Sequence, residues 1–232
     1  ALRVEGDLPR DEVALGEPLA CVLHALESAA RARARYGLTD ARATRNVLIL
    51  GAGPAGLLFL QSLRSVLGFD GPIFVAERNP LKLALAERFG ATPLAASGPD
   101  LVRDVLDRTR GEKIHLLIEA TGAGAVFRLI PGQLRKQGTL VLYGHGHEGV
   151  DMSLLNAVQF LEPTLVAPTG ASGGFDDDGR PSIYRRALTH LVEGRVRVGP
   201  LITDRPGFES LPRVFESDQA RPDFIKAVLL PA

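Results

Sequence analysis

The pattern of apolar and polar residues predicts alternating strands and helices along most of the chain. Short apolar runs, which suit strands buried on both faces of a parallel sheet, occupy 47–50, 72–76, 113–120, 138–143 and 163–168, with a weaker run at 91–96. Apolar residues recur at helical spacing over 55–67, 81–89, 101–106, 123–136, 153–160 and 183–192, and Pro131 should kink or shorten one of these helices. The alternation predicts an α/β fold: a doubly wound parallel sheet of about six strands with helices on both faces.

The two ends of the chain depart from this alternation. Residues 1–14 carry scattered charges and turn-forming residues, which are typical of a linker. Residues 15–36 have helical spacing that becomes polar towards the end, which predicts an entry helix. A short strand at 201–203, a helix at 211–215 and a last strand at 224–230 are predicted beyond the main sheet.

The glycines that follow the first predicted strand form the clearest functional pattern. Gly51 permits a sharp turn, Gly53 has no Cβ to keep an anion off the backbone, and Gly56 lets the next helix lie close to the strand. The N–H groups of the first helical turn then face the anion, and Pro54 loses nothing there because its missing N–H would have been unpaired. This turn predicts a pyrophosphate site. The alternative is that the glycines only shape a strand-to-helix turn.

An acidic residue at the end of the second predicted strand supports the pyrophosphate site. Glu77 lies 21 residues beyond Gly56, about the offset at which a carboxylate meets the adenosine ribose hydroxyls of a dinucleotide. The two features together predict a Rossmann fold. A carboxylate here favours NAD because it would repel a 2′-phosphate, whereas Arg78 beside it could pair with that phosphate. NADP is therefore the less favoured alternative.

Composition argues against several other classes of protein. Lys and Arg total 27, as do Asp and Glu, so no net charge attracts nucleic acid or an anionic membrane. The single cysteine, Cys21, excludes an intramolecular disulfide and a four-cysteine zinc site, which suits the reducing cytoplasm. We find no apolar segment that approaches the roughly 20 residues of a membrane span, and the first residues are too polar for a signal peptide. We therefore expect a cytoplasmic protein that binds neither nucleic acid nor membrane.

Several residue strings in a fixed order resemble the zinc-dependent medium-chain alcohol dehydrogenase superfamily, most closely its polyol (sorbitol) and threonine dehydrogenase branch. The strings are GEPLACVLHAL at 16–26, GAGPAGLL at 51–58, AERNPLKLALAERFGA at 76–91, EATG at 119–122, GTLVLYG at 138–144, GRVRVGPLIT at 194–203 and FIKAVL at 224–229. The resemblance implies the NAD(P)-binding part of an enzyme that oxidises a polyol, sugar or amino alcohol by hydride transfer to nicotinamide. It also implies a homo-oligomer, a dimer paired through the edge strand at 165–168.

The same resemblance implies roles for individual residues. Those around the pyrophosphate are Gly51, Gly53, Pro54, Ala55 and Gly56, with Lys226 approaching it. Those at the adenosine ribose are Glu77 and Lys82, with Arg78 adjacent. Those lining the nicotinamide side are Thr121, Gly122, Tyr143, Gly144 and His145. Glu17 of the Glu17-Pro18 pair is the one catalytic and metal candidate, because the glutamate of this pair lies beside zinc in polyol dehydrogenases; the alternative is a helix-start acid favoured by the helix dipole.

Family members also carry an amino-terminal, barrel-like catalytic domain that holds zinc, and this chain has no counterpart of its first zinc ligands. The triplet Gly146-His147-Glu148 has the same sequence as one of the family's zinc-ligand segments, but it follows the fifth predicted strand. We therefore interpret the match as a coincidence in a loop near the cofactor. We expect a fragment that, alone, neither binds zinc nor oxidises an alcohol. Its expected parts are a linker and entry helix at 1–45, the dinucleotide-binding domain at 46–200 and a return segment of the catalytic domain at 201–232.

Two other functions remain compatible with the sequence. One is a truncated module that binds NAD(H) for regulation. The other is a zinc-independent relative such as a quinone or enoyl reductase, in which the cofactor alone does the hydride chemistry, although Glu17-Pro18 argues against it. The Tyr-x-x-x-Lys pair of short-chain dehydrogenases fails at Tyr36, Tyr143 and Tyr184, since no lysine lies four residues after any of them.

Overall fold

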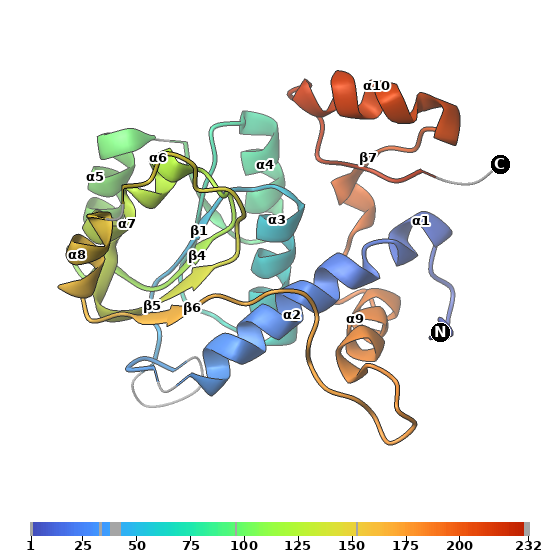
Figure 1. Ribbon diagram of the computed structural model, residues 1–232, viewed down its shortest axis with the longest axis horizontal. Helices are drawn as coiled ribbons and strands as arrows, with labels where there is room; N and C mark the ends of the chain where they lie inside the picture. The colour runs from blue at the N-terminus through green and yellow to red at the C-terminus, as the bar shows by residue number, and fades with distance from the viewer. Residues whose placement is uncertain (1, 33, 38–42, 96, 152, 230–232) are drawn as a thin grey trace.

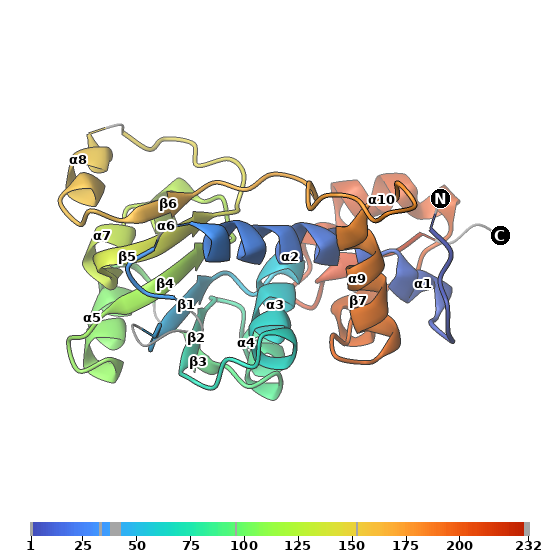
Figure 2. The same cartoon turned by 90° about the horizontal axis from the view of Figure 1, so that it is seen from below.

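The computed structural model describes residues 2–32, 34–37, 43–95, 97–151 and 153–229. A six-stranded sheet with strand order β3-β2-β1-β4-β5-β6 forms its centre, and every neighbouring pair is parallel (Figures 1 and 2). The strands are β1 (Val47–Leu50), β2 (Ile73–Ala76), β3 (Thr92–Leu94), β4 (Ile114–Glu119), β5 (Leu134–Leu142) and β6 (Thr164–Val166). The predicted doubly wound sheet is therefore confirmed. Its strand order reverses between β1 and β4, and at such a switch point the carboxyl ends of the strands bound a ligand crevice.

Helices cover both faces of this sheet (Figure 2). The first face is covered by α2 (Gly16–Arg31), α3 (Pro54–Gln61), α4 (Pro80–Arg88) and α9 (Ser182–Val192). The second face is covered by α5 (Gly98–Arg108), α6 (Gly124–Phe127) and α7 (Ile130–Gln133), with α8 (Leu154–Gln159) beside them. Side chains of β1 alternate between the two cores, Val47 and Ile49 in one and Leu48 and Leu50 in the other, because successive strand residues point to opposite faces.

Helix α3, which begins at the glycine turn, is held firmly by its apolar residues. Leu57, Leu58, Phe59 and Leu60 are all 0% exposed. The helix continues as a π-helical turn over Ser62–Val66, a variation that the apolar spacing at 55–67 did not predict. Fixing α3 against β1 fixes the position of its amino end, which is the predicted anion site.

The region after α6 differs from the prediction of one helix over 123–136. Pro131 lies in the first turn of α7, where a proline is tolerated, and the helix ends at Gln133. Strand β5 begins already at Leu134, which pairs with Ile114 before the register shifts. The pairing of Leu134 with Ile114, rather than the local sequence, therefore sets the boundary between the helix and the strand.

The entry region also departs from expectation in detail. A four-residue helix, α1 (Arg10–Val13), lies within the predicted linker, and α2 ends at Arg31 rather than near residue 36. By length and composition alone, Arg10–Arg31 with a mean hydropathy of 1.2 could cross a membrane, which corrects our expectation that no segment was long enough. However, 56% of its apolar window is buried inside the protein, and a buried core helix passes the same test.

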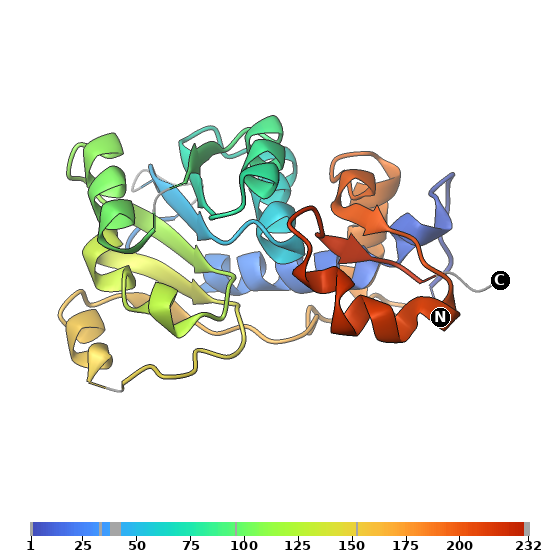
Figure 3. The same cartoon turned by 90° about the horizontal axis from the view of Figure 1, so that it is seen from above.

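The last segment forms a small second sheet beside the main one (Figure 3). Its strands β7 (Ile202–Asp204) and β8 (Lys226–Ala227) are parallel, and α10 (Leu211–Glu216) lies between them in the sequence. The segment also contains 3-10 turns at Gly199–Leu201, Phe208–Ser210 and Asp218–Ala220. Strand β8 is shorter than the predicted 224–230, whose last residue lies outside the described part of the chain. Phe208 and Phe215 of this segment are 59% and 66% exposed, so it presents apolar surface to its surroundings.

Candidate dinucleotide site

The glycine turn has the geometry of a phosphate cradle. Gly51 has a φ of +101°, in the region that favours glycine, and a Cβ on Gly56 would lie 2.0 Å from the carbonyl oxygen of Gly51. By contrast, a Cβ on Gly53 would meet nothing within 4 Å. Gly53 is the N-cap residue of α3, and no side chain among the described residues accepts a hydrogen bond from the N–H groups at the start of this helix. The turn therefore combines open space with the free N–H groups and positive dipole of a helix amino end, which suit an anion.

Glu77 lies beside this turn, as predicted. Its Oε2 accepts a hydrogen bond from the backbone N–H of Ala52 at 3.1 Å. Its Oε1 accepts from the backbone N–H groups of Arg78 at 2.8 Å and Asn79 at 3.1 Å. These bonds hold the carboxylate in one orientation, and a carboxylate has about four acceptor positions, so one remains for a ligand hydroxyl.

The other two residues predicted near the ribose are less firmly held. Arg78 is exposed, and Lys82 is half-buried in the first turn of α4. Asn79 caps that helix, and its Oδ1 accepts a hydrogen bond from the backbone N–H of Lys82 at 3.3 Å. Lys226 is exposed on β8, and among the described residues no side-chain hydrogen bond joins it to the glycine turn.

The second half of the crevice is built around Glu119, the last residue of β4, whose side chain is 0% exposed. Its carboxylate accepts hydrogen bonds from the backbone N–H groups of Thr121 at 2.7 Å and Gly122 at 3.0 Å, and from the Thr121 hydroxyl. Its Oε2 lies 2.8 Å from Nε2 of His147. The buried charge is thus surrounded by donors, which offset the cost of its desolvation.

The residues predicted on the nicotinamide side lie together in this half. A Cβ on Gly122 would lie 1.8 Å from the carbonyl oxygen of His145, and one on Gly144 would lie 2.2 Å from the nitrogen of Gly122. The two halves meet at the switch point, where a Cβ on Gly51 would lie 2.8 Å from Cγ2 of Thr121. Gly122 and Gly144 require glycine because their backbones are in direct contact, whereas Gly51 is confined by the Thr121 side chain and by its positive φ.

Tyr143 connects this region to the entry helix. Its ring packs edge-on against Phe59 with the centroids 4.9 Å apart. Burial, followed by the neighbouring Cys21 and Glu17, raises the pKa of Tyr143 to about 12. The Sγ–H of Cys21 donates to Oε1 of Glu17 at 3.0 Å, and burial together with this bond raises the pKa of Cys21 to about 12. The structure therefore brings Glu17 near the predicted nicotinamide side.

The described residues do not fit zinc by themselves. They contain no group of three or more histidine, cysteine, aspartate or glutamate side chains placed to hold a metal ion. Glu17 offers one carboxylate, but its neighbour Cys21 keeps its proton, and zinc binds the thiolate. The role of Glu17 at a metal stays a prediction.

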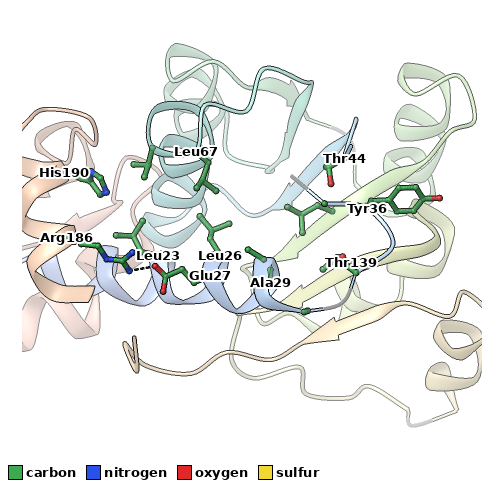
Figure 4. A pocket seen from close by; sticks show the side chains of 16 residues that line it. Leu23, Leu26, Glu27, Ala29, Tyr36, Thr44, Leu67, Thr139, Arg186 and His190 are labelled. Carbon is green, nitrogen blue, oxygen red and sulfur yellow. Dashed lines mark hydrogen bonds and ion pairs between the residues drawn. The ribbon is translucent and has the colours of Figure 1, made fainter. Parts of the chain in front are cut away.

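A separate cavity of about 310 Å³ lies along α2, between α2, the end of α3 and α9 (Figure 4). Its walls include the apolar side chains of Leu23, Leu26 and Leu67, and the ion pair between Glu27 and Arg186 lies at its edge. None of the predicted site residues lines this cavity. It is therefore distinct from the crevice at the carboxyl ends of the strands.

The strand order, the cradle and the acid beside it define a fold of the Rossmann class, in which dinucleotides bind at the switch point. Residues 54–186 match the family of zinc-binding dehydrogenases. The chain belongs to this family and corresponds to the coenzyme-binding part of the medium-chain alcohol dehydrogenases, which confirms the resemblance.

Individual relatives are similar to the chain in sequence, and solved structures are similar to it in fold. The chain is 28% identical to sorbitol dehydrogenase from Pongo abelii over 210 residues, which are 89% of this chain and 53% of that protein. Its fold matches that of an alcohol dehydrogenase from Escherichia coli CFT073 in complex with NADH, with a TM-score of 0.76 and 17% identity over 99% of this chain and 61% of that one. A structure from Sinorhizobium meliloti 1021 bound to NADP gives a TM-score of 0.72 and 24% identity over 94% and 58% of the two chains. The chain spans about half the length of the curated relatives it matches.

Sequence reasoning missed the importance of two residues in this crevice. Glu119 was noted only as part of the EATG string, although a carboxylate that ends an otherwise apolar strand is a signal for a buried hydrogen-bond centre. His147 was interpreted as part of a coincidental triplet, yet it lies within hydrogen-bonding distance of that carboxylate. Their contact joins positions 28 residues apart, and no local pattern predicts it.

The raised pKa of Cys21 predicts a thiol that reacts slowly in the folded chain. At pH 8 an aromatic disulfide reagent should label folded Cys21 at least about a hundredfold more slowly than the urea-unfolded chain, because the thiolate is the reactive species. The unfolded chain loses this proton at lower pH, so the free energy of unfolding should fall from pH 9 towards 12, by up to about 1.4 kcal/mol per pH unit. Cys21→Ala should lack that part of the slope. Fast labelling of the folded chain would contradict the assignment.

Proposed function

We propose that this chain binds NAD(H) as the coenzyme part of a zinc-dependent dehydrogenase that oxidises a polyol, sugar or amino alcohol. The observation that carries the proposal is the open space at Gly53, bounded by free helix N–H groups and by the oriented carboxylate of Glu77. Relatives include proteins named sorbitol dehydrogenase and D-altritol 5-dehydrogenase, which supports the substrate class. The groups that activate the alcohol are proposed to lie in protein beyond this sequence, and residues 201–232 to pack against it.

NAD is proposed over NADP because of the way Glu77 is held. Three backbone N–H groups fix its carboxylate beside the glycine turn, so it cannot swing away from a 2′-phosphate. A phosphate there would meet a fixed negative charge at short range, which disfavours NADP. Arg78 is exposed and could pair with that phosphate from the solvent side, so selectivity rather than exclusion is expected.

The proposed roles of the residues are to bind and orient the two ends of the cofactor. A bound nicotinamide supplies the hydride acceptor for alcohol oxidation. The turn from Gly51 to Gly56 holds the pyrophosphate, and Glu77 holds the adenosine ribose. The contacting backbones of Gly122 and Gly144 bound the other half of the crevice. Tyr143 packs against Phe59 of α3, and burial, which raises its pKa to about 12, keeps its hydroxyl protonated at neutral pH.

Two glycine substitutions test the cradle. Gly53→Ala should leave the melting temperature unchanged within about 2 °C, because its φ of −72° suits alanine and its Cβ meets nothing within 4 Å. It should weaken NADH binding at least about tenfold in calorimetry, because the Cβ enters the space for the pyrophosphate. Gly56→Ala, whose Cβ would lie 2.0 Å from a backbone oxygen, should lose stability as well, by about 1–3 kcal/mol. Undiminished NADH binding by Gly53→Ala, or no NADH binding by the parent chain, would refute the proposal.

We also propose pairing of two chains through β6, the edge strand expected at 165–168. The outer side of β6 has no neighbour in the described sheet, and Leu165 on it is 53% exposed. Continuing the sheet across a two-fold axis would cover this unpaired edge. Sedimentation velocity at micromolar concentration should give a dimer for the parent chain and a monomer for Leu165→Lys. A monomeric parent chain would be the contrary result.

A further inference from the structure

The loop that follows β5 lies tightly against the start of α6 (Figures 1 and 3). A Cβ on Gly124 would lie 2.3 Å from the carbonyl oxygen of Glu148, and the backbone N–H of His147 donates to the carbonyl oxygen of Gly122 at 2.5 Å. Gly146 has a φ of +122°, which turns the chain so that the His147 side chain points back towards β4. The loop is therefore shaped by its contacts with the end of β4.

One side chain of the loop reaches the buried carboxylate. Nε2 of His147 lies 2.8 Å from Oε2 of Glu119, and the imidazole ring also packs on Phe127 with the centroids 5.4 Å apart. The other donors to Glu119 come from Thr121 and Gly122, which belong to the turn directly after β4. Glu119 thus accepts from two separate backbone segments, and His147 is the described side chain that links the second segment to the first.

These contacts fix the wall of one half of the crevice. The carbonyl oxygen of His145 leaves no room for a side chain at Gly122, and the nitrogen of Gly122 leaves none at Gly144. In a doubly wound fold the first three strands take one mononucleotide, and the strands beyond the switch point take the other. The wall formed by Gly122, Gly144 and His145 belongs to that second half, whereas Glu77 and the glycine turn belong to the first.

We propose that His147 is a positioning residue for the nicotinamide half of the cofactor, acting through Glu119. The pair holds the backbone from Gly144 to His147 against Gly122, so that this half of the crevice has its binding shape before the cofactor arrives. Pre-formed walls raise affinity because ordering them costs nothing at the moment of binding. This role rests on the proposed binding of a dinucleotide, and it assigns to His147 the task of holding the nicotinamide subsite in its binding shape.

The far end of the loop has its own attachment, which makes the effect of His147 local. The guanidinium of Arg128 donates to the carbonyl oxygen of Gly149. The backbone N–H groups of Gly144 and His147 donate to the carbonyl oxygens of Glu119 at 2.8 Å and Gly122 at 2.5 Å. Removing the His147 side chain should therefore loosen the stretch between Gly144 and Glu148 without detaching it, and should leave the rest of the connection to α8 in place. The adenosine half does not contact this stretch through any hydrogen bond of the described residues.

Two ligands, NADH and ADP-ribose, distinguish a positioning role of His147 from a general effect on stability. NADH occupies both halves of the crevice, whereas ADP-ribose lacks the nicotinamide ring. His147→Leu keeps an apolar contact with Phe127 but cannot donate to Glu119. It should weaken NADH about tenfold in isothermal titration calorimetry, the scale of one lost hydrogen bond to a charged group, and change the affinity for ADP-ribose less than about twofold.

Two further variants complete the test. His147→Gln can still place an amide N–H near Glu119 and should recover most of the NADH affinity. Glu148→Gln removes an exposed charge from the same loop without touching Glu119 and should bind both ligands as the parent does. Equal weakening of NADH and ADP-ribose in His147→Leu, no weakening of either, or no recovery in His147→Gln would overturn the positioning role. A parent chain that binds neither ligand would instead overturn the proposed function itself, and the inference with it.

Discussion

The crevice depends on one steric constraint, the absence of a side chain at Gly56. The first turn of α3 approaches the end of β1 so closely that a Cβ here would lie 2.0 Å from the carbonyl oxygen of Gly51. This approach puts the free N–H groups at the start of α3 directly beyond the sheet, where they and the helix dipole favour an anion. The apolar residues Leu57 to Leu60 are fully buried and hold the helix in that position. Core packing and site geometry are therefore set by the same helix.

The two halves of the crevice share one structural arrangement. In each half a glutamate stands at or just beyond the end of a parallel strand and accepts backbone N–H groups from the adjacent turn, Glu77 after β2 and Glu119 in β4. The two differ in exposure. Glu77 is partly exposed and keeps acceptor capacity for a ligand hydroxyl, whereas Glu119 is 0% exposed and its donors are all from the protein. One acid thus keeps an acceptor position open at the crevice, and the other shapes the wall.

The sequence predicted the fold and the position of Glu77 beside the glycine turn because their signals are local. Apolar runs mark the strands, and Gly51, Gly53, Gly56 and Glu77 have a spacing that follows from strand, turn and helix geometry. The features that were wrong or missed depend on contacts between distant residues. Leu134 becomes part of β5 because it pairs with Ile114, which no helix-forming pattern at 123–136 could indicate. The contact between Glu119 and His147 spans 28 residues and appears only when the end of β5 folds back on β4.

Hydrogen exchange of backbone amides, followed by mass spectrometry with and without NADH, tests the central claim most directly. If the cradle holds the pyrophosphate, the amides of Ala55 and Gly56 should exchange more slowly in the presence of NADH, because a phosphate oxygen accepts their hydrogen bonds. Amides of Thr121, Gly122, Tyr143, Gly144 and His145 at the second half should be protected as well. Exchange at Ala55 and Gly56 that stays the same at saturating NADH would contradict the claim that this turn binds the cofactor.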